Sequence, residues 1–581
     1  MSPVHPRWIP VTAALLAGLA ALGARHGVAS ACGGFFCDSG GPQGLVLQAR
    51  EDILFVQDGD RIEAQVAVAY QGGPDEFAWI VPVPSEVEVD VGSPYVFTQL
   101  AASVSPRFTY TVTSSEFCSV ANDGGVGCSS EDAAVGSSSG RGEDTDSPGG
   151  DTPGVEVIRQ EQVGPYDYTV LAATSTSSML EWLAANDYDI PPETASLLEP
   201  YVLMGDQTRF VALKLQKGAS VGELQPVVLR YTDEQPMIPI QLTAVAAVQD
   251  MGIQVTVVGD DRAVPQNYLS VEPNWSRIDW RAGGANYETV AGEAIEEAGG
   301  RAFVTEFAGT RSDLPGVEDF GLVAFDADRI RAIDGGSLAL FQQQVRASGM
   351  SWDANVIALV TRYLDVAPDV LARNGITLTD IATNPELYAP LPGTGSTFDV
   401  ASARDELLER LVLPHNLAVE RIAGRYLTRL YTRLSPAEMT VDPVFVQAPG
   451  LAPVANTQAA TARNSCFRET AFRTTISIPG GRVIEASTGG FGVPGGLQGA
   501  PAASRVLQYD ARGAESVVID NTAGVDAAIG RSNAAELRAI DPADDCRVAP
   551  GVGRQVVTLA PVVLGLLLMR RRALRVRSAQ A

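Results

Sequence analysis

Six cysteines are the residues whose type most directly suggests chemistry in this sequence. No two of them form a Cys-x-x-Cys pair, the spacing typical of zinc and redox sites, so we expect disulfides in an exported chain. Short loops are the easiest to close, which favours Cys32 with Cys37 and Cys118 with Cys128. Cys466 and Cys546 remain, and they either pair with each other or leave Cys546 for attachment to a membrane.

Histidine chemistry is nearly excluded, because the sequence holds only three histidines, His5, His26 and His415. His415 precedes a predicted long helix, where we expect it to cap the helix or to lie on the surface. Paired carboxylates could still perform acid–base catalysis, but 69 acidic residues single out no pair. The sequence therefore predicts no catalytic residue, no metal ligand and no cofactor.

Three short motifs lack the context that would give them a function. Residues 391–395 read Leu-Pro-Gly-Thr-Gly, a sorting signal elsewhere, but no apolar anchor follows directly. Residues 490–495 read Gly-Phe-Gly-Val-Pro-Gly, but no helix pattern follows to hold a dinucleotide phosphate. Residues 274–276, Asn-Trp-Ser, form a glycosylation sequon that matters only in a host that glycosylates.

The charge of the chain excludes one class of partner. The formal net charge is −27 over 581 residues, with only Lys214 and Lys217 among the lysines, so nearly all positive charge is arginine. Such an acidic surface repels nucleic acid and other anionic polymers but could attract divalent cations. Hydrophobic residues make up 45% of the chain, enough to build sizeable cores.

The N-terminus is typical of a secretory signal peptide, residues 1–31. Residues 11–22 carry no charge, and Ala29 and Ala31 supply the small side chains that signal peptidase cuts after, just before Cys32. Two alternatives stay open: an anchor that is never cut, and a lipoprotein signal in which Cys32 is lipidated.

The C-terminus, residues 546–581, is predicted to be an anchor or sorting tail. Residues 556–569 are apolar and would span about 21 Å as a helix, short of a hydrocarbon core of about 30 Å. The arginines that follow should stay cytoplasmic, which places everything upstream outside the cell. These are Arg570, Arg571, Arg572, Arg575 and Arg577.

Between the two ends, the sequence predicts a multidomain α+β protein. Its regions are a β-rich unit at 32–113, a flexible Ser/Gly/acidic loop at 114–154, a mixed α+β region at 155–330, a mainly helical region at 331–445 and a β-rich region at 446–545. The opening unit is expected to be an antiparallel sheet, with residues 77–84 at a strand end or edge because of their prolines.

Hydrophobic periodicity predicts individual elements. Strands are expected at 44–48, 53–56, 62–70, 155–161, 166–172, 209–215, 227–231, 238–246, 253–258, 301–308, 466–478, 483–486 and 505–509. Helices are expected at 94–103, from Thr176, at 287–298, at 402–412 and at 417–434, the last with its arginines facing outward.

Several stretches together resemble the bacterial DUF2330 proteins, an uncharacterised family of exported, often surface-anchored proteins. The resemblance implies a bacterial origin and export, and it supplies no activity and no catalytic residues. The Cys546 tail is also loosely similar to the C-terminal sorting tails of myxobacterial surface proteins. The stretches are residues 31–37, 77–84, 265–268, 302–309, 427–434, 438–440 and 442–445.

These observations predict an exported bacterial protein anchored at the cell envelope by its C-terminal tail. Its most favoured role is a binding or structural surface module for an envelope polymer, a protein or divalent cations, and not for nucleic acid. The alternative is an envelope hydrolase that uses two carboxylates about 5–9 Å apart.

Overall fold

The structure is a computed structural model that describes residues 47–71, 78–84, 86–114, 153–188, 190–205, 208–216, 224–388, 397–467, 471–486, 496–510 and 512–540. The described residues form a mixed α+β protein with 34% helix and 37% strand, which confirms the predicted fold class. The predicted signal peptide, the loop at 115–152, the C-terminal tail and the motifs at 391–395 and 490–495 lie outside the described residues.

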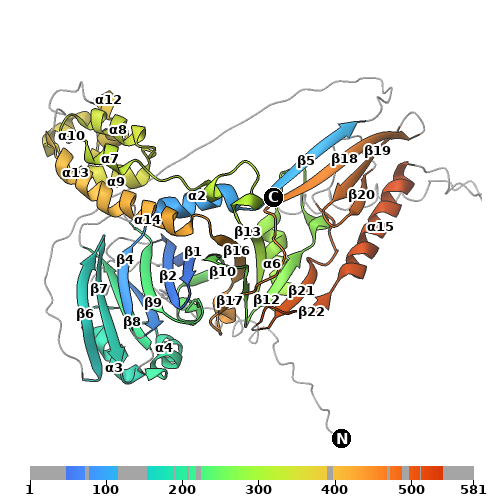
Figure 1. Cartoon of the computed structure of the whole chain (residues 1–581), viewed down its shortest axis with the longest axis horizontal. Coiled ribbons are helices and arrows are strands. Elements are labelled where there is room, and N and C mark those ends of the chain that lie inside the picture. Colours follow the sequence, from blue (N-terminus) through green and yellow to red (C-terminus); the bar gives the residue numbers. More distant parts are fainter. Residues whose placement is uncertain are drawn as a thin grey trace, which may run out of the picture.

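A ten-stranded mixed sheet forms the centre of the molecule (Figure 1). β1 pairs in parallel with β10, and β12 in parallel with β13, whereas the other pairs are antiparallel. Its strands come from four of the predicted regions, so these regions share one sheet. Across the sheet, the order of the strands is β22 (Glu515–Asp520), β21 (Ala503–Tyr509), β12 (Leu269–Pro273), β13 (Ala302–Gly309), β16 (Tyr426–Leu434), β10 (Ala247–Gly259), β1 (Leu47–Asp58), β2 (Arg61–Gln71), β9 (Val227–Thr232) and β4 (Val87–Val91).

A four-stranded antiparallel sheet packs against one face of this large sheet. Its order is β3 (Ala78–Pro84), β8 (Thr208–Leu215), β7 (Tyr166–Ala173) and β6 (Val155–Val163). The two sheets enclose the largest apolar core, to which β1, β2, β9 and β10 contribute from one side and β3, β7 and β8 from the other. Helices α3 (Thr176–Ala185), α4 (Thr194–Val202) and α5 (Ile240–Thr243) cover the outer face of the four-stranded sheet.

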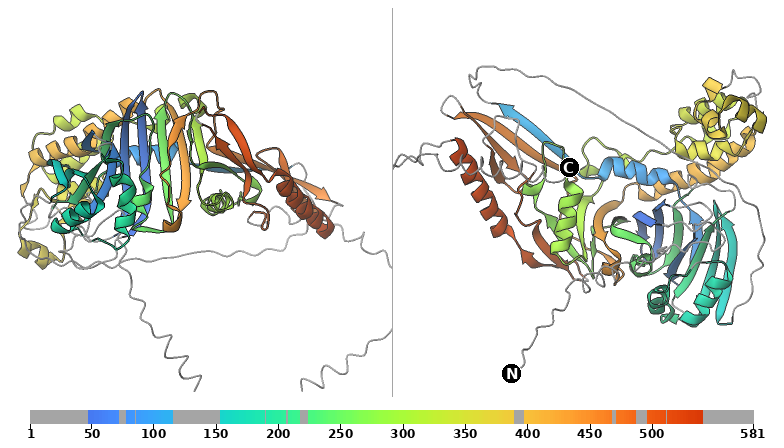
Figure 2. Two further views of the ribbon diagram at one scale, coloured as in Figure 1. Left: turned by 90° about the horizontal axis from the view of Figure 1, so that it is seen from below. Right: turned by 180° about the vertical axis from the view of Figure 1, so that it is seen from behind.

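Helices also cover the opposite face of the large sheet. α2 (Pro94–Val104) and α14 (Leu413–Ile422) pack on β1, β10 and β16, and α6 (Tyr287–Glu297) packs on β12 and β13. A separate helical cluster, which lies apart from the sheets in Figures 1 and 2, has its own core. Its helices are α7 (Ala327–Arg331), α8 (Leu338–Ala347), α9 (Ala354–Thr361), α10 (Pro368–Asn374), α11 (Leu378–Thr383), α12 (Pro385–Tyr388) and α13 (Val400–Leu407), continued by a π-helical turn (Leu408–Val412).

The C-terminal part adds a second four-stranded sheet and a long helix. The sheet has the order β20 (Arg482–Ala486), β19 (Ala471–Ile478), β18 (Thr457–Phe467) and β5 (Arg107–Ser114). α15 (Thr522–Ile540) packs along β20. Two small two-stranded sheets, β11 (Ala263–Pro265) with β17 (Phe445–Gln447) and β14 (Leu364–Asp365) with β15 (Thr397–Phe398), complete the described elements.

The largest error of the sequence prediction concerns residues 417–434. The expected single helix is helix α14 followed by strand β16, which lies between β13 and β10 in the middle of the large sheet. Leu427, Leu430 and Leu434 are spaced like a helix face, but they lie on opposite faces of a strand that is buried on both sides. The arginines do not all face outward, because Arg429 is buried.

Other expectations also need correction. Residues 238–246 hold the short helix α5 instead of a strand. Residues 47 and 48 of the strand expected at 44–48 and the strand expected at 53–56 belong to one continuous strand, β1, and residues 44–46 lie outside the described residues. The opening unit does not form one sheet of its own: β1 and β2 pair antiparallel as expected, but β3 belongs to the four-stranded sheet and β4 pairs with β9. The single strand expected at 466–478 is the end of β18 and the whole of β19, which pair antiparallel, and the region at 446–545 also contains α15, which the sequence analysis missed.

Two polar residues lie deeper than expected. His415 is fully buried against Phe325, with its Nε2 3.0 Å from the carbonyl of Val323, so it neither caps a helix nor lies on the surface. Burial lowers its pKa. Asn274 of the sequon is also buried, and its side chain bonds Ser276 and Pro501, so it is not accessible to glycosylation in the folded chain.

Glu51 gives a prediction about stability. It is buried at the start of β1, where Gln48 donates a hydrogen bond of 3.0 Å, and burial raises its pKa from 4.5 to about 7. The folded state therefore holds a proton that the unfolded state has lost, and stability falls as pH rises from about 4.5 to 7. We expect Glu51→Gln to remove this cost. Between pH 4.5 and pH 8, the free energy of unfolding should therefore fall by up to about 3 kcal/mol less in the variant than in the natural protein.

Urea unfolding at the two pH values measures this difference, with Glu156→Gln on the exposed strand β6 as the matched control. An equal pH dependence in Glu51→Gln and the natural protein would show that Glu51 is not the group responsible.

Candidate functional site

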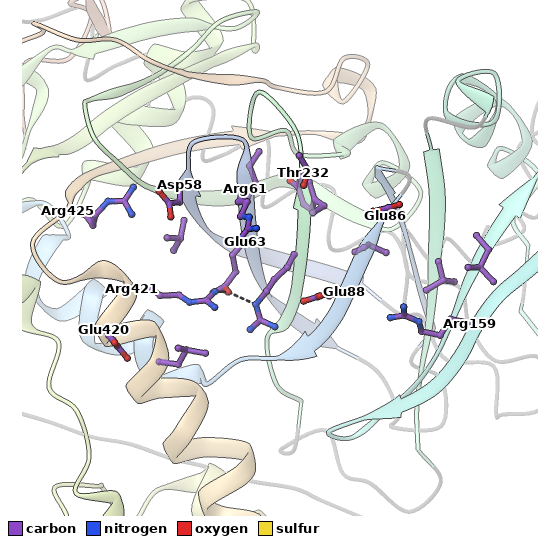
Figure 3. A pocket seen from close by; sticks show the side chains of 18 residues that line it. Asp58, Arg61, Glu63, Glu86, Glu88, Arg159, Thr232, Glu420, Arg421 and Arg425 are labelled. Atoms are coloured by element: carbon purple, nitrogen blue, oxygen red, sulfur yellow. Dashed lines mark hydrogen bonds and ion pairs between the residues drawn. The ribbon is translucent and has the colours of Figure 1, made fainter.

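A cavity with a volume of about 1050 Å³ lies among the described residues. It surrounds one end of the large sheet, where β1 and β9 finish and β2 and β4 begin (Figure 3). β6 and β7 of the four-stranded sheet lie on one side of it and α14 on the other. Its lining residues are Val56, Asp58, Arg61, Ile62, Glu63, Glu86, Val87, Glu88, Ile158, Arg159, Val170, Arg230, Tyr231, Thr232, Leu417, Glu420, Arg421 and Arg425.

The lining combines apolar and charged side chains. Seven of the residues are apolar or aromatic, and of these Ile62 and Val170 also belong to the core between the sheets. Five are arginines and five are acids, a balance that differs from the whole chain, where 69 acids outnumber 42 basic residues. The cavity therefore has an apolar floor and a rim with both signs of charge.

Glu63 is the centre of the charged network. Its carboxylate is almost buried and accepts hydrogen bonds from Arg230 Nε at 2.7 Å and from Gln65 Nε2 at 2.8 Å. Arg421 of α14 forms a further ion pair with the same oxygen that binds Arg230. Arg230 also reaches Asp90 of β4 at 2.9 Å. One carboxylate thus ties β2, β9 and α14 together (Figure 3).

The other arginines of the rim differ in how they are held. Arg425 hydrogen-bonds the carbonyl of Gln57 at 2.5 Å and lies 3.5 Å from Asp260. Arg61 and Arg159 are exposed, and within the described part of the chain neither forms a salt bridge. These two guanidinium groups can bind a ligand without first losing a carboxylate partner.

The cavity exists because the two sheets separate at this end. β4 and β6 are the last strands of their sheets and approach each other. They meet where Gly164, directly after β6, lies against Val91 at the end of β4: a Cβ on Gly164 would lie only 2.7 Å from Val91 Cγ1, and the φ of Gly164 is +53°. At their other ends, Glu86 and Ile158 line the open cavity.

A second cavity of about 210 Å³ lies on the α14 side and shares Glu63, Arg230 and Leu417 with the larger one. Leu413 and Leu417, one helical turn apart on α14, are 40% and 39% exposed along these cavities. Exposed aliphatic side chains beside a cavity add apolar surface that a ligand could cover.

The carboxyls best suited to proton transfer lie elsewhere. Glu306 sits at a β-bulge of β13, where Arg429 donates to it at 2.7 Å and Tyr287 at 3.0 Å. Burial raises its pKa, against the opposing effect of the Arg429 guanidinium. Neither Glu306 nor Glu51 lines a cavity found here, so a substrate in these cavities would not reach them.

The structure tests few of the residues that the sequence singled out. Cys466 lies in β18, paired across the hairpin with Phe472 of β19. The other predicted site residues lie outside the described part of the chain: Ala29, Ala31, Cys32, Cys37, Cys118, Cys128, Cys546, Arg570, Arg571 and Arg572. The disulfides, the signal cleavage and the anchor therefore stay predictions.

The described residues contain neither a metal-binding cluster nor a membrane-spanning helix. Within them, no group of three or more His, Cys, Asp and Glu side chains is arranged to hold a metal ion. No helix in the same ranges is both long enough and apolar enough to cross a membrane.

Sequence reasoning missed the cavity residues. They come from separate segments between Val56 and Arg425, and no local motif marks them. The only available signal was the concentration of positive charge in arginine, which does not tell one arginine from another.

Comparison with known proteins identifies the family. Residues 27–319, which are 293 of 581 residues, match the model of DUF2330, described as an uncharacterized protein conserved in bacteria. The chain belongs to the DUF2330 family. No curated protein and no solved structure matches it. The match covers the cavity strands β1, β2, β4, β6, β7 and β9 and ends before α14.

The Glu63 network generates a second prediction. Glu63→Gln removes the charge that two arginines share, and we expect it to lower the free energy of unfolding by about 2 kcal/mol, less than for a fully buried pair because both arginines reach solvent. Urea unfolding measures the loss. Glu88→Gln on exposed β4 is the control and should change stability by less than about 0.5 kcal/mol. Equal losses in the two variants would contradict the central role of Glu63.

Proposed function

We propose that this DUF2330 protein is exported, held at the cell envelope by its C-terminal tail, and binds another envelope component through the cavity around Glu63. Export is supported by the apolar run at residues 11–22 and the small residues before Cys32. Anchoring is supported by the apolar run at 556–569 and the arginines after it.

The cavity itself carries the proposal of binding. Its volume of about 1050 Å³ is at the upper end of the range typical of ligand sites, and it combines an apolar floor with convergent charged groups. Arg61 and Arg159 are exposed at its rim, where Arg159 also interacts with the side chain of Tyr168. Three of the ten charged lining residues, Glu63, Arg230 and Arg421, are already held in the Glu63 network, which lowers the cost of ordering side chains when a ligand binds.

One observation favours the second candidate, a hydrolase with paired carboxylates. Glu86 and Glu88 both line the cavity and lie two residues apart in the chain, so the cavity is bordered by a pair of neighbouring carboxylates, the residue type that glycosidases use. Both side chains are exposed, however, whereas a general acid at neutral pH is usually a carboxyl held protonated by burial. Binding is therefore the function that this geometry supports better.

Photo-crosslinking in intact bacteria tests the binding function with the full chain. A photoreactive residue replaces Thr232 in the cavity, and in a control it replaces Thr461, an exposed threonine of β18 away from the cavity. We expect an adduct in the envelope fraction from position 232 and none from 461. Absence of an adduct at 232, or recovery of the uncut chain in the cytoplasm with reduced cysteines, would refute the proposal.

The hydrolase alternative has its own test. Purified full-length protein is incubated with peptidoglycan and a panel of polysaccharides, and released reducing ends are measured beside the Glu86→Gln/Glu88→Gln double variant. We expect no turnover above background in either protein, because Glu63, the buried acid of the cavity, is bonded to Arg230 and Arg421, and Glu86 and Glu88 are exposed. Turnover that the double variant abolishes would replace binding with catalysis as the function.

A further inference from the structure

β4 and β6 each present an unpaired backbone edge to the same cavity. β4 is the last strand of the ten-stranded sheet and β6 the last strand of the four-stranded sheet, and no other described strand pairs with their outer sides. Both strands run toward the contact between Val91 and Gly164, so they form a wedge that widens toward Glu86 and Ile158. Unpaired edges of this kind are templates for an additional strand.

The hydrogen-bond register identifies the free groups of β4. The amide of Gly92, just after the strand, bonds the carbonyl of Pro226 at 2.7 Å, and in an antiparallel pair the bonded positions alternate. Asp90 and Glu88 therefore also face β9, whereas Val87, Val89 and Val91 direct their backbone groups outward. Consistent with this, the Val91 amide bonds a side-chain oxygen of Asp90 instead of a neighbouring strand.

β6 offers a complementary edge. All of its residues are exposed except the partly buried Val155 and Val163 at its two ends, and the exposed ones include the apolar Val157 and Ile158. A bulge between Val157 and Arg159 interrupts its pairing with β7. Exposed aliphatic side chains on an edge strand are unusual without a partner to cover them, because they promote association.

The side chains around the wedge favour a polypeptide over an anionic polymer. The five acids on the rim oppose a polyanion, and the five arginines oppose a polycation. An extended peptide places alternate side chains on opposite faces of the strand, as β4 itself does. One set would lie toward the apolar residues Ile62, Val170 and Tyr231, and the other toward the charged groups around Arg230.

We infer that the partner is an extended polypeptide segment that adds as a strand to the outer edge of β4 and fills the wedge toward β6. This inference rests on the proposed binding function of the cavity and specifies its ligand. Main-chain hydrogen bonds to Val87 and Val89 supply the part of the affinity that does not depend on the peptide's sequence. The alternation of aliphatic and charged side chains supplies the selectivity between peptides.

Substitution at Val89 tests strand addition directly. Val89→Pro removes an outward N–H and leaves the bonds between β4 and β9 intact, because proline is tolerated on an edge strand when its nitrogen faces outward. Val89→Ala is the matched control: it removes most of the same side chain and keeps the N–H. The probes are synthetic nonapeptides in which Val or Ile alternates with Lys or Glu, tested against the purified full chain in an array and then by fluorescence anisotropy.

We expect Val89→Pro to weaken the best peptide at least tenfold relative to Val89→Ala, and alternate N-methylation of that peptide to weaken it similarly. Thermal melts must show the two variants folded alike. If Val89→Pro misfolds, the N-methylated peptide against the natural chain decides alone. Equal affinities for the methylated and unmethylated peptides would overturn strand addition.

The outcomes separate this inference from the proposed function. If position 232 crosslinks to a glycan in intact cells and no peptide binds, the inference of a polypeptide partner fails and the binding function stands. If position 232 yields no adduct and no peptide binds, both fail. An adduct at 232 to a polypeptide, with the loss of affinity in Val89→Pro, supports both.

Discussion

The packing of the four-stranded sheet on the ten-stranded sheet is the constraint on which the rest of this structure depends. The two sheets share one apolar core, and where β4 and β6 meet, only a glycine at position 164 allows the chain to approach Val91 so closely. Twisted sheets that are held together at one corner diverge at the opposite end of their edges. The cavity is therefore a consequence of how the sheets are joined.

Arginine supplies nearly all of the positive charge that pairs with the acidic residues of these sheets. With only two lysines in the chain, almost every positive charge has a planar guanidinium that can bond two partners at once. Arg230 does this by joining Glu63 and Asp90, and Arg429 reaches the buried Glu306 from the neighbouring strand. Each of these pairs connects elements that are distant in sequence. In an acidic protein, such pairs place repelling carboxylates at defined positions and keep the sheet ends ordered.

How much of this could be predicted depends on whether the information is local. Strands with clear alternation, such as β7 and β8, and the helix α6 with its glycine stop are within one or two residues of their predicted bounds. The helix expected over the residues of β16 was wrong because a central strand is buried on both faces. Its leucines therefore lack the alternation that identifies a strand, and their spacing matches that of a helix by coincidence. His415 was misplaced because its burial comes from Tyr95 and Phe325, neither of which is near it in sequence.

The short stretches by which the sequence resembles the family and the residues that line the cavity are different sets, although the family match itself also covers the cavity strands. This difference has a physical reason. Trp79, Tyr268, Phe303, Leu430 and Phe445 lie in those stretches and converge on the core between the two sheets. A core residue must pack against many neighbours at once, so core positions form a recognisable pattern of residue types in the sequence. The exposed rim residues, such as Arg159, Glu88 and Thr232, have few neighbours to satisfy and leave none. A change of rim side chains would alter what the cavity binds without disturbing the core that forms it, which makes the scaffold and its selectivity separable.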